Sequence, residues 1–519
     1  MKKWKFRPDA KTIVVGASRD CFPVELCKRR LKAIGDAMAG YGLLIASTII
    51  ENRDSVAAAV QEVTESSAKI VVLFLANFSP EQEDARFIKA MNELGITVMI
   101  IAASEEGIED LQVVEGKCNR GDALCGLLSA NYTCTLGKLH FFIPARPVGT
   151  TKQLVKVIEH FMVVMSIVLS LKGARIGIIG GRPNDFPTCE TREDVLRGFG
   201  AETHLLTLVD LQQAISQARG KTTSLVAEMR QELGPEGIGI ATQELFEDMA
   251  AYELALRSLF EQHDLSAACG ECWPRFDGTF GHVPCYVNSR MDGSGNPMIC
   301  EGDGMGAFTA LAVQAATNAS TTTLDINHTI PPELIASVAV ALGISYEECV
   351  GLFHCGRTPI EHLLRQIGGK ACGICRQLIM ERLQGSEITG GTLEAAIAPG
   401  PITIVRIHHS PADGLAQAYA AQGYFLEVDP CTFGGVGTAY IPGFLRFYRY
   451  GLLGRRFPHH CIVGFSHCAE ALFDAFTIMG IPWDRIEYNR ALGNPYEGEN
   501  PWSNPALVAQ CSPQVIAAQ

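Results

Sequence analysis

Two carboxylates near the middle of the chain have the types and spacing expected of a divalent metal site. Glu301 follows a short apolar segment in MICEGDGMGAFTALAVQ, and Asp325 lies within the strand-like run TTTLDINH. A carboxylate in such a run is unfavourable unless something binds it. One helix and one returning strand separate the two, which can bring carboxylates from adjacent strands to the same end of an α/β sheet. Asp303 and His328 are nearby competitors, and the non-functional interpretation makes Asp303 a helix N-cap and Asp325 a turn residue.

A histidine from the C-terminal part of the chain would complete such a site. FPHHCIVGFSHC presents His459, His460 and His467 around an apolar strand, and RIHHSP supplies His408 and His409 as rivals. One imidazole with two carboxylates suits Mn²⁺, Co²⁺ or Mg²⁺ better than a closed structural zinc site. A lone histidine is more often a hydrogen-bonded core residue than a ligand, so spacing alone does not choose among these.

Two Cys-x-x-Cys pairs offer a competing chemistry. Cys269 and Cys272 come directly before Trp273, and Cys372 and Cys375 form the second pair. A zinc site needs both pairs to converge on one ion from short polar turns. Here the first pair ends an apolar strand, and the second is expected to open a helix, whose N-terminus would lower a thiol pKa. We expect packed thiols, with a redox or iron-sulfur site as the alternative.

Two other motifs are weaker evidence for a functional site. RIGIIGGRP places glycines after a strand but lacks the G-x-G-x-x-G order of a phosphate-binding loop, so a tight turn is the better interpretation. In HCGRTP, His354 and Cys355 are adjacent on an expected strand, and adjacent strand side chains point to opposite faces. A catalytic dyad of these two residues is therefore not favoured.

The elements around these residues predict an α/β protein of three domains. KTIVVGA, AKIVVLFLANF and GITVMIIAAS read as buried strands between helical segments, which indicates a Rossmann-like α/β domain over residues 1–171. ARIGIIGG restarts the pattern, so a central α/β domain with Glu301 is expected over residues 172–317, with EGIGIATQ and LSAACGEC as strands. Short strands with Gly- and Pro-rich connections then predict a mainly β domain over residues 318–519, which contains Asp325 and His460.

Composition narrows the class of protein. A chain of 519 residues with 47% hydrophobic and 19% charged residues is too long for one core. The net charge of −13 argues against nucleic acid as a partner. The start of the chain lacks a secretory apolar region, and FMVVMSIVLSL is about half of a membrane span. We expect a cytoplasmic protein without a membrane span, and its 18 cysteines to be reduced.

Several motifs together resemble one enzyme family. In order and spacing they resemble motifs of the L-fucose isomerase family and its relatives, L-arabinose isomerase included. The motifs are CWP at 272–274, CEGDGMGAFTALAVQ at 300–314, Asp325, LFHCG at 352–356 and HHCIVGFSH. The resemblance covers the C-terminal half in motif detail and the N-terminal half only in its α/β pattern. It implies that the C-terminal domain is barrel-like, and that the chain assembles into trimer-based homohexamers whose sites draw residues from neighbouring chains.

The resemblance also implies an activity and a metal site. The activity is that of a metal-dependent aldose–ketose isomerase acting through a cis-enediol on an open-chain sugar such as L-fucose or D-arabinose. The metal, most commonly Mn²⁺, would be held by Glu301, Asp325 and His460, with His460 preferred to His459. It would stabilise negative charge on the sugar oxygens, and Glu301 and Asp325 would also serve as the base and acid.

Substrate contacts follow less directly from the resemblance. Trp273, with Cys272 and Pro274, is expected to form a pocket wall beside the sugar, and Arg19 in SRDCFP is a further candidate substrate contact. Arg19 or Arg275 would suit a sulfonated sugar. The competing functions are a non-catalytic sugar-binding or regulatory protein, since tandem α/β domains also serve that purpose, and a redox protein built on the Cys-x-x-Cys pairs.

Overall fold

The computed structural model describes residues 11–105, 112–114, 117–119, 121–273, 275–364, 366–367, 370–379, 390–429, 431 and 434–489. Of these, the residues between 11 and 166 belong to one compact unit and those between 167 and 489 to another. Parallel α/β sheets occur in both units, and a large, mostly antiparallel sheet follows in the second, which confirms the predicted fold class. The domain limits after residues 171 and 317 stay predictions.

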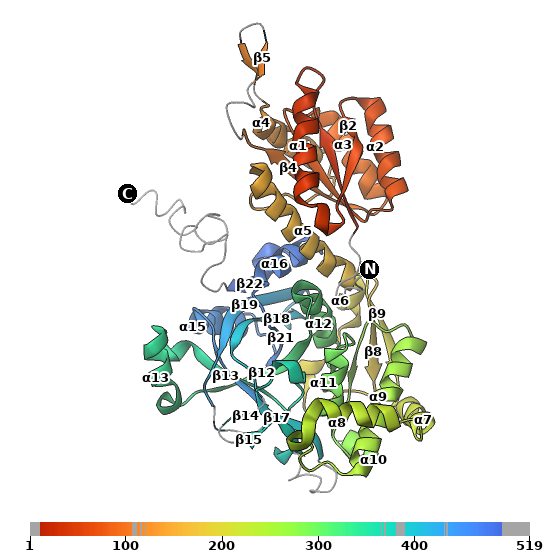
Figure 1. The fold of residues 1–519 in the computed structure, drawn as a ribbon, viewed down its shortest axis with the longest axis vertical. Helices are drawn as coiled ribbons and strands as arrows, with labels where there is room; N and C mark the ends of the chain where they lie inside the picture. The colour runs from red at the N-terminus through yellow and green to blue at the C-terminus, as the bar shows by residue number, and fades with distance from the viewer. Residues whose placement is uncertain are drawn as a thin grey trace. The chain divides into compact units, whose positions relative to one another are not determined.

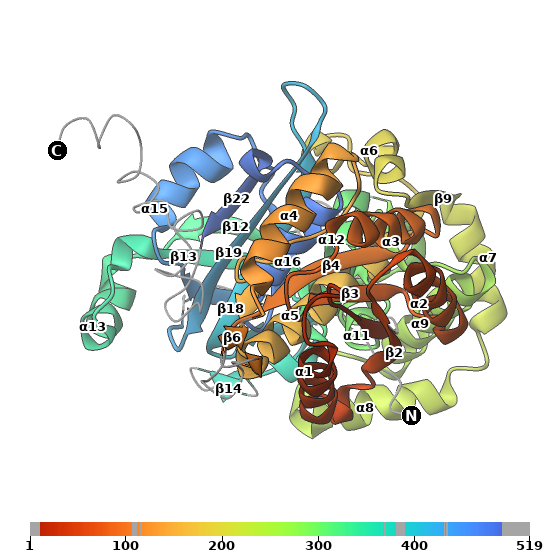
Figure 2. The same cartoon turned by 90° about the horizontal axis from the view of Figure 1, so that it is seen from above.

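The N-terminal unit is built on a five-stranded parallel sheet (Figures 1 and 2). Its strands in spatial order are β2 (Leu44–Ile50), β1 (Thr12–Ala17), β3 (Ile70–Leu75), β4 (Thr97–Ala103) and β7 (Val148–Gly149). Its helices are α1 (Val24–Ala37), α2 (Arg53–Ser66), α3 (Glu81–Glu93), α4 (Ala123–Leu136) and the first part of α5 (Thr151–Leu171). Every residue of β1 and β3 is buried, because strands in a parallel sheet are covered on both faces. This explains their unbroken apolar runs.

Helix α5 is the one helix in the described ranges with the length and apolar composition needed to cross a membrane. In its most apolar window, 56% of the residues are buried inside the protein. The core helix of a soluble protein has the same features, so this is weak evidence for a span.

A four-stranded parallel sheet opens the second unit. Its spatial order is β11 (Met298–Ile299), β10 (Ala267–Gly270), β8 (Arg175–Ile179) and β9 (Glu202–Leu206). Helices α6 (Glu193–Gly198), α7 (Leu208–Ala218), α8 (Thr223–Gly237), α9 (Gln243–Gln262), α10 (Phe276–Phe280) and α11 (Cys285–Gly293) belong to this part. The carboxyl ends of β8, β10 and β11 share one edge, where parallel sheets usually bind ligands.

The C-terminal part contains a closed barrel of antiparallel strands. Its six strands in order are β20 (Gly435–Tyr440), β13 (Cys349–His354), β12 (Thr321–Thr329), β21 (His460–Gly464), β18 (Gly400–His409) and β19 (Ala416–Leu426). Pairing of β19 with β20 closes the ring, which leaves none of these six strands at an open edge. The sheet extends at its margins through β16 (Gly373–Arg376), β17 (Gly390–Ala396) and β22 (Ile486–Asn489), and α13 (Pro332–Leu342) and α16 (Ala469–Ile478) also belong to this part.

Helix α12 (Gly304–Thr317) joins the parallel sheet to the barrel. It contacts β10 of the sheet. It also contacts β18 and β21 of the barrel, which lie beside it in Figure 1. Thirteen of its 14 residues are buried, and most are Gly, Ala or other small residues that let strands approach from both sides. The N-terminus of α12 is therefore held between the two layers, which positions the residues just before it.

Two expected elements are wrong. EGIGIATQ is not a strand: α8 ends at Gly237 and α9 begins at Gln243. Gly239 has a φ of +55°, and the carbonyl oxygen of Ile374 lies 2.0 Å from where a Cβ would be, so close packing rather than strand pairing selects this glycine. Cys375 does not open a helix but lies in β16, which pairs with β17.

Candidate active site

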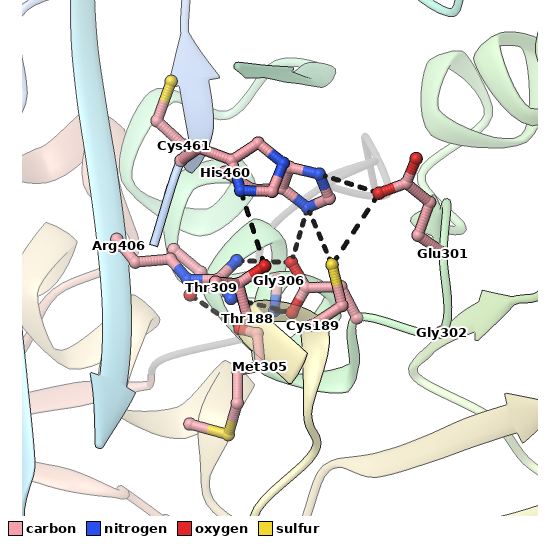
Figure 3. A network of polar contacts seen from close by, with 12 residues as sticks. Thr188, Cys189, Glu301, Gly302, Met305, Gly306, Thr309, Arg406, His460 and Cys461 are labelled. Atoms are coloured by element: carbon pink, nitrogen blue, oxygen red, sulfur yellow. Dashed lines mark hydrogen bonds and ion pairs between the residues drawn. The ribbon is translucent and has the colours of Figure 1, made fainter. Parts of the chain in front are cut away.

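Glu301 lies in a sharp turn between β11 and α12. Its φ is +61° and that of Gly302 is +68°, so two successive residues adopt the left-handed conformation. A Cβ on Gly302 would lie 2.4 Å from the carbonyl oxygen of Gly181, so only glycine fits there. A left-handed glutamate is uncommon and costs backbone energy, a feature that clusters at functional sites. The turn places the Glu301 carboxylate beside His460 (Figure 3).

Asp325 and His460 meet Glu301 from the barrel. Asp325 on β12 lies directly opposite His460 on β21, so their side chains share one face of the sheet. His460 Nε2 is 3.2 Å from Glu301 Oε2 and 3.4 Å from Asp325 Oδ1. The structure thus brings the three predicted ligands together. The expectation that both carboxylates come from adjacent strands of one sheet is wrong, because β11 and β12 belong to different sheets.

Asp303 lies behind His460 and is fully buried. It caps α12 by accepting a hydrogen bond from the Gly306 backbone N–H at 2.8 Å, which confirms the N-cap interpretation. It also accepts two hydrogen bonds from Arg406, at 2.6 and 2.8 Å, and one from His460 Nδ1 at 3.0 Å. The sequence analysis named Asp303 as a rival ligand or a helix N-cap and did not identify Arg406.

Two further buried side chains reach the same cluster. Cys189 Sγ lies 3.7 Å from Glu301 Oε2 and 3.8 Å from His460 Nδ1 (Figure 3). Potential ligand atoms of Asp325, His354 and His460 lie within 4.8 Å of one another, as do those of Cys189, Glu301 and His460. The sequence analysis did not favour His354 as a catalytic residue, because its pairing with the adjacent Cys355 was not favoured. The proximity of His354 to Asp325 comes from strand packing, which residue spacing in the sequence does not reveal.

An aromatic surface borders the carboxylates. Trp273 donates a hydrogen bond from Nε1 to Glu301 Oε1 at 3.1 Å. Its ring packs edge-on against Phe186 with centroids 5.3 Å apart, and Phe186 lies 5.6 Å from the His459 ring. Phe186 comes from the turn-rich segment after β8, which the sequence identified only as a turn. Cys272 is partly buried beside Trp273, and Pro274 lies outside the described residues.

The rival histidines are placed differently. His459 Nε2 is 3.9 Å from Asp325 Oδ1, and its side chain is 38% exposed against 1% for His460. His408 and His409 stack on each other at 4.3 Å, and His467 contacts the carbonyl of Gly423. His328 contacts Asn327. Of the candidate histidines, His460 has the shortest distances to both carboxylates.

Arg19 belongs to the N-terminal unit, directly after β1. Its backbone N–H donates to Asn77 Oδ1 at 3.1 Å and its guanidinium donates to the Ser79 carbonyl at 2.8 Å. The guanidinium also lies over the Phe78 ring at 4.2 Å. Arg19 is thus held at the carboxyl edge of the first sheet, and its role toward a substrate stays a prediction. Arg275 is paired with Glu271 through Nε at 2.6 Å.

The Cys-x-x-Cys pairs form no shared site in the described part of the chain. Cys269 is buried within β10, Cys272 follows that strand, and Cys372 and Cys375 lie at β16. No group of three or more potential metal ligands among the described residues includes any of the four. This arrangement agrees with packed thiols.

Two family models match the chain. The fucose/sulfoquinovose isomerase N-terminal domain matches residues 13–172, and the L-fucose isomerase C-terminal domain matches residues 352–487. Together they account for more than half of the sequence. The chain belongs to the fucose isomerase-like family. By family, this fucose isomerase-like protein is a sugar isomerase. His460 falls within the second matched segment, whereas Glu301 and Asp325 lie between the two.

Other comparisons add little to the identity of this fucose isomerase-like protein. No curated protein matches it. Among solved structures, a crystal structure described as a putative LacI transcriptional regulator from Bacteroides fragilis is 13% identical, covering 59% of this chain and 91% of that one, with a TM-score of 0.16. A TM-score this low carries no argument about fold or function.

The two carboxylates of this isomerase-family site differ in protonation. Burial alone would raise the pKa of Glu301, but the charge of a protonated His460 ring 3.2 Å away outweighs it and lowers that pKa to about 2. Burial raises the pKa of Asp325 to about 7, against the attraction of His460. For Asp303, burial is outweighed by Arg406 and then His460, so its pKa is held well below the usual range. The surroundings therefore lower the proton affinity of Glu301 and raise that of Asp325.

Proposed function

We propose that this protein is a metal-dependent aldose–ketose isomerase that acts on an open-chain sugar such as L-fucose, D-arabinose or a related sugar, sulfonated ones included. The observation that carries the proposal is the convergence of Glu301 Oε2 and Asp325 Oδ1 on His460 Nε2, at 3.2 and 3.4 Å. Membership of the fucose isomerase-like family supports the reaction class. A cytoplasmic homo-oligomer, trimer or hexamer, is part of the proposal and rests on the family resemblance.

The residues present fit a divalent cation. Asp325 Oδ1 and His460 Nε2 are buried and make no hydrogen bond, and buried polar atoms of this kind need a partner. Glu301, Asp325 and His460 would hold the ion, and two carboxylates with one imidazole favour Mn²⁺, with Co²⁺ or Mg²⁺ as alternatives. When bound, the ion would supply Lewis-acid stabilisation of negative charge on the sugar oxygens.

The chain's own residues would move the proton. Aldose–ketose interconversion moves one proton from C2 to C1 and another from O2 to O1, with a cis-enediol as the intermediate. Glu301 and Asp325 are the carboxylates beside which C1 and C2 would lie, and each is a candidate to take or return the proton. Trp273 holds Glu301 through its Nε1–H, and together with Phe186 it offers an apolar surface to the sugar.

A panel of aldoses tests the proposal. The protein loaded with Mn²⁺ is incubated with L-fucose, D-arabinose, L-arabinose and a sulfonated hexose, and ketose formation is followed by a colorimetric assay and by NMR. We expect at least one aldose to be converted. Failure on every sugar, with the metal shown to be bound, would favour the non-catalytic sugar-binding protein instead.

A further inference from the structure

We propose that Asp303 is a positioning residue that fixes the ring proton of His460 on Nδ1 and so presents the Nε2 lone pair to Glu301 and Asp325. This inference rests on the proposed function in one respect: Nε2 is taken to be a metal ligand. Asp303 itself faces the opposite edge of the imidazole from that ligand atom, so its effect on a bound cation acts through His460.

The hydrogen-bond geometry determines which nitrogen carries the proton. Asp303 Oδ2 lies 3.0 Å from His460 Nδ1. An ionised carboxylate can only accept, so Nδ1 must be the donor, and a neutral imidazole protonated there has its lone pair on Nε2. The other group near Nδ1 is the Cys189 thiol at 3.8 Å, which is a much weaker acceptor. In the neutral ring, the form that can bind a cation, Asp303 therefore sets the tautomer.

Asp303 is kept ionised by its surroundings. Arg406, which has no exposed surface, donates to both of its oxygens at 2.6 and 2.8 Å, and a guanidinium remains charged at any ordinary pH. The first turn of α12 contributes the Gly306 N–H at 2.8 Å, where the helix dipole also favours negative charge. A protonated, donating Asp303 is therefore disfavoured.

The same contacts prevent the ring from turning. His460, Asp303 and Arg406 come from β21, the turn before α12, and β18, and their exposed fractions are 1%, 0% and 0%. Rotation of the imidazole by half a turn would break the Nδ1 hydrogen bond and leave a buried carboxylate oxygen without that donor. Such a loss is costly in the protein interior. The parallel sheet and the barrel thus jointly hold Nε2 toward the carboxylates.

A second buried ion pair in the same chain supplies a matched control. Asp292 and Arg357 are both fully buried, with Arg357 Nη2 2.5 Å from Asp292 Oδ2, and Asp292 also accepts a backbone N–H, that of Met298, at 2.8 Å. This pair resembles Asp303 with Arg406, except that no hydrogen bond joins Asp292 to a histidine. Asp303→Asn and Asp292→Asn each neutralise one buried acidic partner and should lower the melting temperature alike.

Metal affinity separates positioning from a general loss of stability. Mn²⁺ dissociation constants are measured by electron paramagnetic resonance of the free ion, for wild type, D303N and D292N below their melting temperatures. We expect D303N to bind Mn²⁺ about 10- to 100-fold more weakly than wild type. D292N should remain within threefold of wild type. Unchanged affinity in D303N, or an equal loss in D292N, would overturn the inference.

The same measurements on the wild-type protein separate failure of this inference from failure of the proposed function. Wild type that binds Mn²⁺ but isomerises no aldose removes the proposed function and leaves the role of Asp303 standing, whereas wild type that binds no divalent cation overturns both. If D303N or D292N does not fold, the double variants D303L/R406M and D292L/R357M replace each pair with apolar side chains, which proteins often tolerate better than a stranded charge. The same difference in Mn²⁺ affinity is then required.

Discussion

Asp325 and His460 lie directly opposite each other on adjacent antiparallel strands, with His460 Nε2 3.4 Å from Asp325 Oδ1. Both strands are interior members of the closed barrel, so neither residue can shift without disturbing the ring of pairings. Glu301 reaches the same nitrogen from the other sheet. The site is therefore built across two layers and held together by α12.

Replacing either carboxylate with its amide tests the proposed roles. In E301Q and D325N the amide keeps the shape but cannot take up the proton, so kcat should fall by roughly 10²- to 10⁴-fold or more, with lower metal content. The checks are steady-state kinetics and elemental analysis, with circular dichroism to confirm folding. Asp413→Asn is the control, because Asp413 is a partly exposed partner of Arg485. Full activity in E301Q or D325N would refute the assignment.

Removing the metal should abolish turnover. Dialysis against a chelator is expected to remove all isomerase activity, and Mn²⁺ should restore it better than Mg²⁺, because the site includes an imidazole nitrogen. Elemental analysis of the purified protein should find about one Mn or Co per chain and no iron or labile sulfide. Iron together with labile sulfide would instead support the redox interpretation of the cysteine pairs.

Trp273 should affect catalysis as well as sugar binding. Trp273→Phe keeps an aromatic face but loses the Nε1–H that binds Glu301 at 3.1 Å, so we expect a lower kcat with a small change in KM. Trp273→Leu also loses the aromatic surface and should raise KM. Trp483→Phe is the control, because that side chain is 73% exposed. A rise in KM alone for W273F would show that the hydrogen bond to Glu301 is unimportant.

Gly302 should tolerate no side chain. Gly302→Ala combines an unfavourable positive φ with a Cβ that would lie 2.4 Å from the Gly181 carbonyl oxygen, so we expect a clear drop in melting temperature and loss of activity. Gly343→Ala provides the comparison: its φ is +66° but nothing lies within 4 Å of the added Cβ. The free energy of unfolding of this variant should fall by only about 1 kcal/mol. Equal melting temperatures for the two variants would contradict the steric argument.

His408 should make the protein less stable in mild acid. Burial and then the charge of Arg406 lower the pKa of His408 to about 3. In the unfolded chain the value is about 6.5, so below that pH the unfolded state binds more protons and stability falls as pH falls toward the folded value. When the pH falls from 7 to 5, this one group should lower the free energy of unfolding by about 2 kcal/mol. Melting temperatures of wild type and His408→Gln at these pH values should therefore diverge, with the shallower dependence in the variant; parallel curves would contradict the prediction.

The sequence by itself determined the fold class, and it pointed to Glu301 and Asp325 as candidate metal ligands. Unbroken apolar runs such as that of β3 predict buried parallel strands. Glu301 and Asp325 were recognisable because a carboxylate beside or within an apolar strand is unfavourable without a ligand. His460 could be preferred to His459 only through the family resemblance, since the two histidines are adjacent in the sequence.

Only the tertiary structure decided how these residues meet and what supports them. Glu301 and Asp325 come from different sheets, and Asp303 joins Arg406 to His460. Three further side chains also lie at the site: Cys189, His354 and Phe186. All of these arrangements depend on contacts between distant segments. Local periodicity carries no information about such contacts. It also could not distinguish a Gly-rich connection from a strand in EGIGIATQ, because strand formation there depends on a neighbouring strand to pair with, and packing against Ile374 took its place.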